Sequence, residues 1–277
     1  MKKLLIVAAV ISTLGIAQIV QAGPKDDLKA FQSYYKSRFP DTKFADFQNG
    51  VYAIDAESRA QWESIEEFPP YEPDIETGKQ LFNTPFKNGK TYASCFKNDG
   101  IGVAQNYPYF DSKAGKVVTL DLAINECRTS NGEEALDFKK GKLAQISAYM
   151  AYTSRGKKID IEIPDDPKAL AAYEAGKTYY YAKRGQLNMS CADCHVNNAG
   201  NRIRADILSP ALGHTTHFPV YRSTWGEIGT LHWRFIGCNE QVRAKASKAQ
   251  SEEYRNLEYF LTYMGNGLEI NGPGFRK

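Results

Sequence analysis

The sequence has 277 residues, of which 42% are hydrophobic and 24% are charged, and its formal net charge is +3 at pH 7. This length is enough for one large domain or two small ones. Nucleic-acid binding needs a concentrated basic face, and a chain so close to neutral gives no sign of one. No nucleic-acid partner is therefore expected.

The N-terminus has the pattern of a secretory leader. Two lysines precede an apolar stretch at residues 4–16, and residues 20–22 fit a small-residue cleavage site, so residues 1–22 are predicted to be a signal peptide. A membrane anchor is the alternative, but the apolar stretch is shorter than the roughly 20 residues that a spanning helix needs. No later stretch is apolar enough to cross a bilayer. We therefore expect a periplasmic protein with no membrane span in its mature form.

Residues 23–75 are predicted to form an N-terminal extension. The stretch DDLKAFQSYYKSRF, which begins at Asp26, has a helical pattern. An aromatic and acidic segment with two adjacent prolines, QWESIEEFPPYEP, follows from Gln61. Its aromatic side chains are expected to pack against the next domain.

The rest of the chain is predicted to hold two copies of one unit, at residues 76–165 and 166–277. ETGKQLF in the first copy corresponds to EAGKTYY in the second, and both lead into a Ser-Cys pair. A spacing of 25 residues from a cysteine to a tyrosine in a helix-like stretch also recurs, starting from Cys127 and from Cys238. Matched features at both ends favour a duplication, with chance similarity as the alternative because the middles differ in length.

Each copy is predicted to run from a first helix through a cysteine-bearing loop and a long irregular middle to a closing helix. In the second copy, Pro167 suits the first turn of the first helix. The closing helix starts at Ser251 and ends at Gly265 or Gly267. Its apolar face follows the helical period and consists of Leu257, Phe260, Leu261 and Met264.

The second copy contains SCADCH, which ends at His195 and includes the Cys-x-x-Cys-His signature of c-type haem attachment. Cys191 and Cys194 would form the thioethers, and His195 would ligate the iron. In the first copy Cys95 is followed by Phe-Lys-Asn-Asp, so the second cysteine and the histidine are missing. We therefore expect a mainly α fold of two cytochrome c-like domains in tandem, the first without haem, and one covalent haem c.

Three of the five cysteines lie outside the attachment motif: Cys95, Cys127 and Cys238. Unpaired thiols are uncommon in oxidising compartments, and three thiols allow one internal disulfide. If an ancestor held haem in both copies and lost the first, Cys95 and Cys127 would be stranded and could pair. Cys238 is then the cysteine left over.

Spacing alone does not decide the second axial ligand of the iron. The candidates are His214, His217, His232, Met189, Met264 and Cys238. Met189 is too near the attachment loop, and Met264 lies on an apolar helical face, while the histidines stay open. Cys238 is favoured because it is left over and because its place matches that of Cys127, with an intermolecular disulfide or a buried thiol as the alternative.

A thiolate ligand would stabilise ferric iron and lower the reduction potential, which suits a site where the sulfur itself reacts. Arg234 stands four residues before Cys238, so its guanidinium can face the sulfur if that turn is helical. A planar, permanently charged fork suits a sulfur oxyanion. A haem propionate is an equal alternative partner.

Five stretches of the chain match a known family: FPPYEPDIETGKQLFNTPFKNGKTYASCF, GQLNMSCADCH, LSPALGH, FPVYRSTWGEIGTLHWRFIGCNEQVRA and EYRNLEYFLTYMGNG. With these motifs the chain resembles the SoxA family, the catalytic subunits of the SoxAX cytochromes of bacterial sulfur oxidation. The resemblance implies an L-cysteine S-thiosulfotransferase that oxidatively conjugates thiosulfate to a cysteine of the SoxYZ carrier. The product would be a cysteine S-thiosulfonate, with two electrons passed to a c-type cytochrome acceptor.

The resemblance also implies site residues and partners. His195 and Cys238 match the axial ligands of the active haem, of which the cysteine is often a persulfide, and Arg234 matches the active-site arginine. SoxX is the implied partner subunit. Some members carry two haems, and the departure at Cys95 resembles the single-haem type. The alternatives are a plain periplasmic electron-transfer cytochrome c and a scaffold for the SoxX haem.

Overall fold

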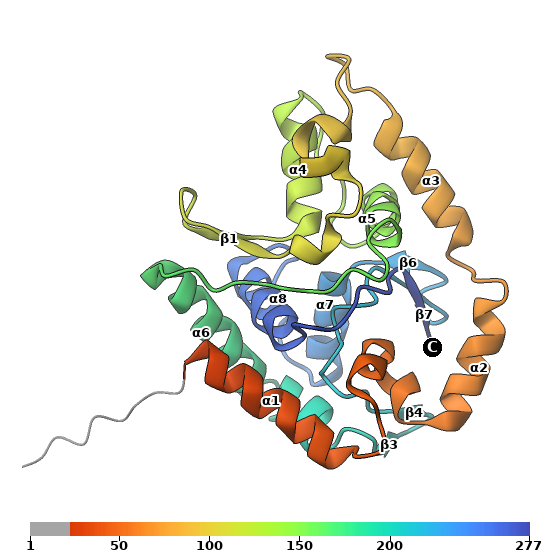
Figure 1. Cartoon of the computed structure of the whole chain (residues 1–277), viewed down its shortest axis with the longest axis vertical. Coiled ribbons are helices and arrows are strands. Elements are labelled where there is room, and N and C mark those ends of the chain that lie inside the picture. Colours follow the sequence, from red (N-terminus) through yellow and green to blue (C-terminus); the bar gives the residue numbers. More distant parts are fainter. Residues whose placement is uncertain (1–22) are drawn as a thin grey trace, which may run out of the picture.

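The computed structural model describes residues 23–277, so the predicted signal peptide at residues 1–22 lies outside the described part. The described chain is mainly helical (Figure 1). Its α-helices are α1 (Pro24–Arg38), α2 (Ala56–Glu66), α3 (Glu72–Asn83), α4 (Leu120–Ser130), α5 (Lys142–Tyr152), α6 (Pro167–Tyr181), α7 (Leu231–Gln241) and α8 (Glu252–Met264). The short strands are β1 (Tyr109–Asp111), β2 (Lys116–Val118), β3 (Arg202–Ile203), β4 (Asp206–Ile207), β5 (Val220–Arg222), β6 (Glu227–Gly229) and β7 (Gly274–Arg276). The 3-10 turns are η1 (Phe44–Ala53), η2 (Tyr92–Cys95), η3 (Lys97–Gly100) and η4 (Ala104–Asn106), and η5 (Asp193–Asn197) is a wider π-turn.

The first unit consists of α3, α4 and α5 with the β1–β2 hairpin, and it forms the upper part of Figure 1. Its core contains Phe82 of α3, Ile124 of α4 and Met150 of α5. Helix α3 begins at Glu72 with a proline in its first turn. It therefore crosses the boundary that the sequence placed between residues 75 and 76.

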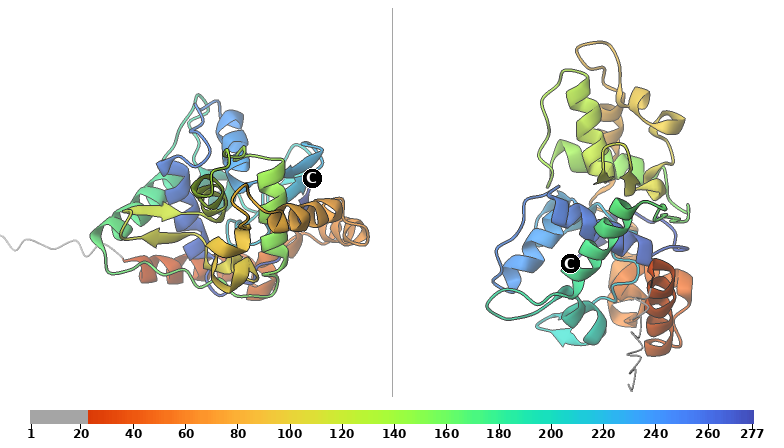
Figure 2. Two further views of the ribbon diagram at one scale, coloured as in Figure 1. Left: turned by 90° about the horizontal axis from the view of Figure 1, so that it is seen from above. Right: turned by 90° about the vertical axis from the view of Figure 1, so that its left-hand side faces the viewer.

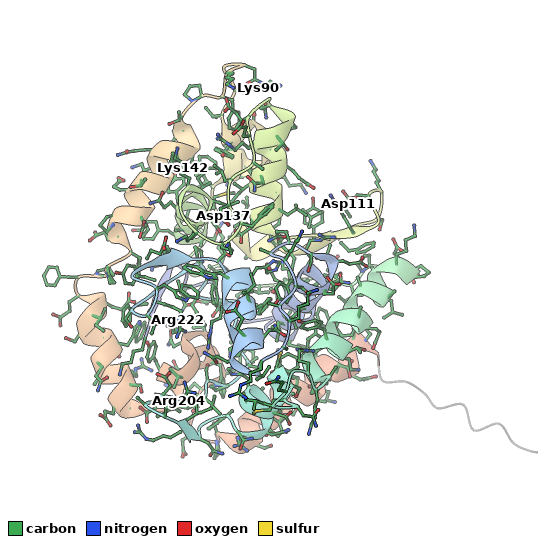
Figure 3. The ribbon with its side chains drawn as sticks, turned by 180° about the vertical axis from the view of Figure 1, so that it is seen from behind. Lys90, Asp111, Asp137, Lys142, Arg204 and Arg222 are labelled. Carbon is green, nitrogen blue, oxygen red and sulfur yellow. A yellow bond between two sulfur atoms is a disulfide. The ribbon has the colours of Figure 1, made fainter. Side chains whose placement is uncertain are left out.

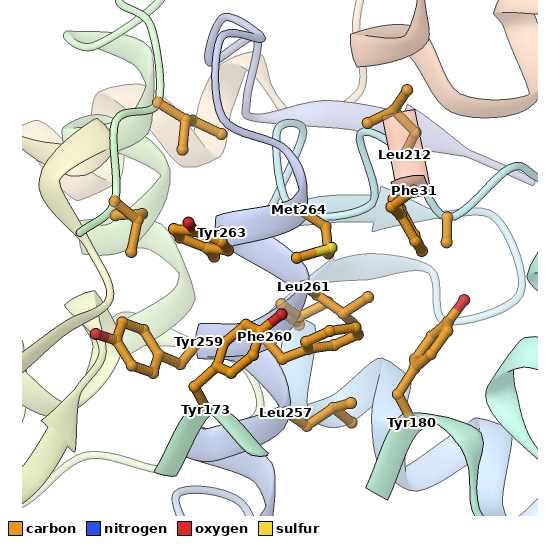
Figure 4. Packing of buried hydrophobic residues seen from close by; sticks show 14 of the residues in the cluster. Phe31, Tyr173, Tyr180, Leu212, Leu257, Tyr259, Phe260, Leu261, Tyr263 and Met264 are labelled. Atoms are coloured by element: carbon orange, nitrogen blue, oxygen red, sulfur yellow. The ribbon is translucent and has the colours of Figure 1, made fainter. Parts of the chain in front are cut away.

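The second unit is built around α6 and α8, with the N-terminal helix α1 packed against α8. Asp166 caps α6 by accepting from the Lys168 N–H at 2.8 Å, and Pro167 occupies the first turn as predicted. The predicted apolar face of α8 is buried. Figure 4 shows its side chains packed against Phe31 of α1 and against Tyr173 and Tyr180 of α6.

The middle of each unit is ordered, which differs from the irregular segment that the sequence predicted. An antiparallel hairpin leads into an eleven-residue helix, β1–β2–α4 in the first unit and β5–β6–α7 in the second. The N-cap threonines of the two helices, Thr119 and Thr230, are 111 residues apart, as are Cys127 and Cys238. Three-residue strands and a short helix with mixed polarity are too brief to produce a clear periodic signal.

The two long helices of each unit cross at a glycine. A Cβ atom at Gly78 of α3 would lie 1.9 Å from the carbonyl oxygen of Gln145 in α5. A Cβ atom at Gly176 of α6 would lie 2.0 Å from the carbonyl oxygen of Asn256 in α8. Only glycine permits this backbone approach, so the matched ETGK and EAGK motifs mark equivalent helix crossings.

A small sheet and an apolar cluster join the two units, which are stacked in the right-hand view of Figure 2. β5 pairs with β6 and also, in parallel, with the C-terminal strand β7. Ile228 of β6 and Phe275 of β7 pack with Ala144 and Ala148 of α5. They also pack with Tyr71, which directly precedes α3. Within residues 23–277, no helix has the length and apolar character needed to cross a membrane.

Candidate functional site

The attachment motif lies between α6 and β3, where the chain forms one helical turn that continues into η5. The His195 Nδ1–H donates to the Ser209 carbonyl at 2.8 Å, which leaves Nε2 for another partner. Tyr35 of α1 donates its hydroxyl to the His195 carbonyl at 2.6 Å. The histidine is therefore held at its ring and at its backbone.

Helix α7 carries both Arg234 and Cys238, so the helical turn that their spacing required is present. Cys238 is partly buried and forms no disulfide. Burial by itself would raise the pKa of its thiol, but Arg234 and a hydrogen bond from the His195 side chain together lower this pKa to about 7. The site thus favours a thiolate at Cys238 near neutral pH.

The attachment cysteines lie in the same electrostatic environment. Burial, followed by the nearby Cys238, raises the pKa of Cys191 to about 11. Burial and Cys238 also raise the pKa of Cys194, which Arg234 opposes. Arg184 Nη1 donates to the Cys191 sulfur at 3.6 Å. The structure therefore brings together the four sulfur and nitrogen donors that the sequence singled out, with Arg234 beside them.

These residues fit a covalently attached haem. Two unpaired thiols and an oriented imidazole are spaced as thioether attachment requires, and Cys238 adds a soft donor from a second element. The donor set matches c-type haem ligation, in which a thiolate is one of the known axial ligands.

The three other histidines are differently engaged. The His214 ring packs edge-on against His195 at 4.4 Å between ring centroids, and burial lowers its pKa well below the usual value. His232 accepts from the Gln250 N–H through Nδ1 at 2.9 Å, and its Nε2 lies 2.9 Å from Glu258. His217 is buried, and burial lowers its pKa as well.

The two methionine candidates lie in different surroundings. Met264 belongs to the core of the second unit. Met189 pairs its backbone with Arg184 in the turn before the attachment motif. Burial in that core engages the Met264 thioether away from His195 and Cys238.

Comparison with known proteins shows the family of this chain. The family model of the SoxA/TsdA cytochrome c domain matches residues 77–159, within the first unit. The L-cysteine S-thiosulfotransferase subunit SoxA of Allochromatium vinosum is 58% identical over 96% of this chain and 95% of its own length. The corresponding subunit of Chlorobaculum tepidum is 58% identical over 91% of this chain and 87% of its own. The chain belongs to the SoxA family. It is the catalytic subunit of an L-cysteine S-thiosulfotransferase.

The SoxA assignment is also supported by a solved structure. The crystal structure of SoxXA from P. pantotrophus covers 76% of this chain and 79% of the matched chain, at 33% identity and a TM-score of 0.69. The alternative of a plain electron-transfer cytochrome is therefore not retained. The mainly helical, cytochrome c-type fold predicted from the sequence is confirmed at this level.

The disulfide lies in the first unit, whereas Cys191, Cys194 and Cys238 lie in the second. Cys95 of η2 is bonded to Cys127 of α4, the pairing that the sequence predicted. Cys127 occupies in α4 the position that Cys238 occupies in α7, and Ala123 stands where α7 has Arg234. The first unit of this SoxA chain therefore lacks the arginine as well as the attachment motif.

Several residues around the site could not be found from the sequence. Ser209 and Tyr35 act through a backbone carbonyl and a long-range hydroxyl contact, for which the sequence holds no local signal. Arg222 lies within the SoxA motif FPVYRSTW, but the motif by itself gives it no role. In the structure it is among the charged groups that act on Cys238.

Proposed function

We propose that Cys238 supplies the sulfur at which thiosulfate conjugation takes place, and that Arg234 binds the anion beside it. The position of both side chains on α7, with Arg234 favouring the Cys238 thiolate, carries this proposal. Cys191 and Cys194 would hold one haem c covalently, and His195 and Cys238 would ligate its iron. When bound, that haem would supply the redox chemistry, as the acceptor of the electrons that the conjugation releases.

The overall reaction balances as one oxidation. A carrier cysteine thiol and thiosulfate give a cysteine S-thiosulfonate, one proton and two electrons. Cys238 would act as thiolate or as persulfide, and Arg234 would hold the sulfonate oxygens through charge-assisted hydrogen bonds. Partial burial of Cys238 would restrict the access of water to the reacting sulfur.

We further infer a tandem arrangement of two cytochrome c-like domains, with haem only in the second. The matched hairpins, helices and glycine crossings support a duplication. The disulfide between Cys95 and Cys127 supports the loss of haem from the first domain. A pyridine haemochrome assay per polypeptide should return about one haem, and a value near two would contradict this arrangement.

The partners follow from the family. The relative of known structure was solved as SoxXA, so a SoxX subunit is the proposed partner, with SoxYZ as carrier and a c-type cytochrome as electron acceptor. The disulfide and the attachment motif favour an oxidising compartment. Together with the leader pattern at residues 1–22, they support a periplasmic location.

The variant Cys238→Met tests the central proposal. Haem should stay attached through Cys191 and Cys194, and the reduction potential should rise because a thioether stabilises ferric iron less than a thiolate does. Conjugation of thiosulfate to SoxYZ should be lost, because the reacting sulfur is gone. Cys95→Ala/Cys127→Ala is the matched control, with two sulfur atoms removed from the first unit and full conjugation expected. Conjugation by Cys238→Met at the normal rate would reduce Cys238 to a structural ligand.

A further inference from the structure

Arg222 is a second arginine near Cys238, and it lies on strand β5 and not on α7. It ends strand β5, at the hairpin that leads into α7, and Figure 3 shows it beside that helix. Its pKa is lowered to about 10, first by burial and then by the charge of Arg234, while Cys238 opposes this. Arg222 and Arg234 thus lie near enough to each other and to Cys238 to interact by charge.

Few protein groups pair with the positive charge and the N–H donors of the Arg222 side chain. Its Nε is buried and has no hydrogen-bond partner. Among residues 23–277, neither Arg222 nor Arg234 forms a salt bridge. An acid that acts on Arg222 by charge is Asp206, which is exposed on β4. Two partly buried cations without a bound carboxylate are costly unless an anion joins them.

Arg222 is nevertheless held in place. Its guanidinium carbon lies 5.5 Å from the centre of the Trp225 ring. Trp225 stacks on Trp233 of α7, with 4.1 Å between the ring centroids. Gly229 makes room for this stack, because a Cβ atom there would lie 2.4 Å from the Trp233 ring. An aromatic support of this kind positions a guanidinium without neutralising it.

The first unit provides an internal comparison. The position equivalent to Arg222 in the β1–β2 hairpin is Asp111, which Figure 3 also labels. Asp111 turns back and accepts from the N–H groups of Lys113 and Ala114 at 2.9 and 3.1 Å. The hairpin therefore does not need an arginine for its own geometry. Arg222 and Arg234 occur only in the unit that carries the attachment motif.

We propose that Arg222 is a second substrate-binding residue, which holds the sulfonate end of thiosulfate together with Arg234. The two positive charges match the two negative charges of thiosulfate, and the unpartnered Nε is a donor for a sulfonate oxygen. This inference rests on the proposed role of Cys238, since it places the anion next to that sulfur.

The test compares Arg222→Gln with Arg222→Lys in the complete complex with SoxX. Arg222→Gln should lower kcat/KM for thiosulfate by about 10-fold to 100-fold, the effect of one lost hydrogen bond to a charged group. Arg222→Lys should recover part of the loss, since it restores the charge but not the fork. KM for SoxYZ and the haem spectrum should stay unchanged. Lys113→Gln, on the tip of the matched hairpin, removes one exposed charge and should leave all values unchanged.

The outcomes separate Arg222 from the rest of the site. A value of kcat/KM for thiosulfate within about twofold of wild type in Arg222→Gln would overturn the proposal. A changed haem spectrum or potential with normal thiosulfate kinetics would overturn it too, and would assign Arg222 to a haem propionate. An effect confined to KM for SoxYZ would assign it to carrier docking instead. Cys238→Met is assayed in parallel, because normal conjugation there would contradict the proposed site itself, whatever Arg222→Gln shows.

Discussion

Arg234 and Cys238 lie one helical turn apart on α7, which is what their proposed joint role requires. The spacing of four residues places both side chains on one face of α7, and the charge of Arg234 lowers the pKa of the thiol against the effect of burial. The same geometry lets the guanidinium face an anion that approaches the sulfur.

Arg234→Lys tests the role of the planar fork. The variant keeps the positive charge but loses bidentate hydrogen bonding, so conjugation should fall by about 10-fold to 100-fold. The haem spectrum should be unchanged, because His195 and Cys238 are untouched. The readout is the initial rate of SoxYZ conjugation at saturating carrier, and an unchanged rate would mean that charge alone suffices.

At the scale of elements, the two helix crossings depend on single glycines. α3 meets α5 at Gly78, and α6 meets α8 at Gly176, with the partner backbone about 2 Å from the place that a methyl group would take at each glycine. Neither pair of helices can keep its separation with a larger residue there.

Gly176→Ala should lower the free energy of unfolding by at least about 2 kcal/mol, because a backbone carbonyl cannot move aside without separating α6 from α8. Gly78→Ala should have a similar effect on the first unit while sparing the haem spectrum. Denaturant unfolding measures both. Gly237→Ala is the control, since its added methyl group would meet only the Arg234 side chain at 3.8 Å. A stability loss for Gly237→Ala equal to that of Gly176→Ala would argue against the crossing explanation.

At the scale of the whole molecule, the two units are stabilised by different means. The first has a disulfide that closes a loop over a sequence separation of 32 residues, whereas the second has the larger aromatic core and the attachment site. A buried carboxyl, Asp121, lies in a cavity lined by both units, together with Ser147 and Glu258.

Removal of the disulfide should destabilise the first unit. Cys95→Ala/Cys127→Ala should lower the free energy of unfolding by about 3–4 kcal/mol, the loop-closure entropy for a loop of this size. The shift of the unfolding transition should be smaller when it is followed by haem absorbance than by far-UV circular dichroism, because the haem motif lies in the other unit. Full stability of the double variant would show that the bond contributes nothing.

Asp121 should make stability depend on pH. Burial, reinforced by the charge of Glu258, raises its pKa to about 7, against about 3.9 in the unfolded chain. The folded chain holds this proton more tightly, so the stabilisation is full below about pH 4 and is lost as the pH rises through about 7.

Asp121→Asn should remove this dependence. The free energy of unfolding of the variant relative to wild type should rise by a few kcal/mol between about pH 4 and pH 8, measured by denaturant titration. Asp160→Asn, at an exposed position, is the control and should leave the profile unchanged. A parallel profile for Asp121→Asn and wild type would contradict the assignment.

The sequence by itself determined the features that are local or countable. Cys191, Cys194 and His195 form a contiguous motif, and three remaining thiols allow only one pair and one leftover. The apolar face of α8 was readable because thirteen residues cover more than three helical turns. These signals need no knowledge of distant contacts.

Tertiary structure alone decided the rest. Helices α4 and α7 and their hairpins were missed, because short elements are stabilised by packing rather than by their own periodicity. Arg222 and Cys238 are separated by sixteen residues and a turn, so only the folded hairpin brings the guanidinium near enough to the sulfur to interact with it by charge. The Ser209 carbonyl orients His195 through a backbone group that every residue possesses. For that reason its position, and not its identity, makes it part of the site.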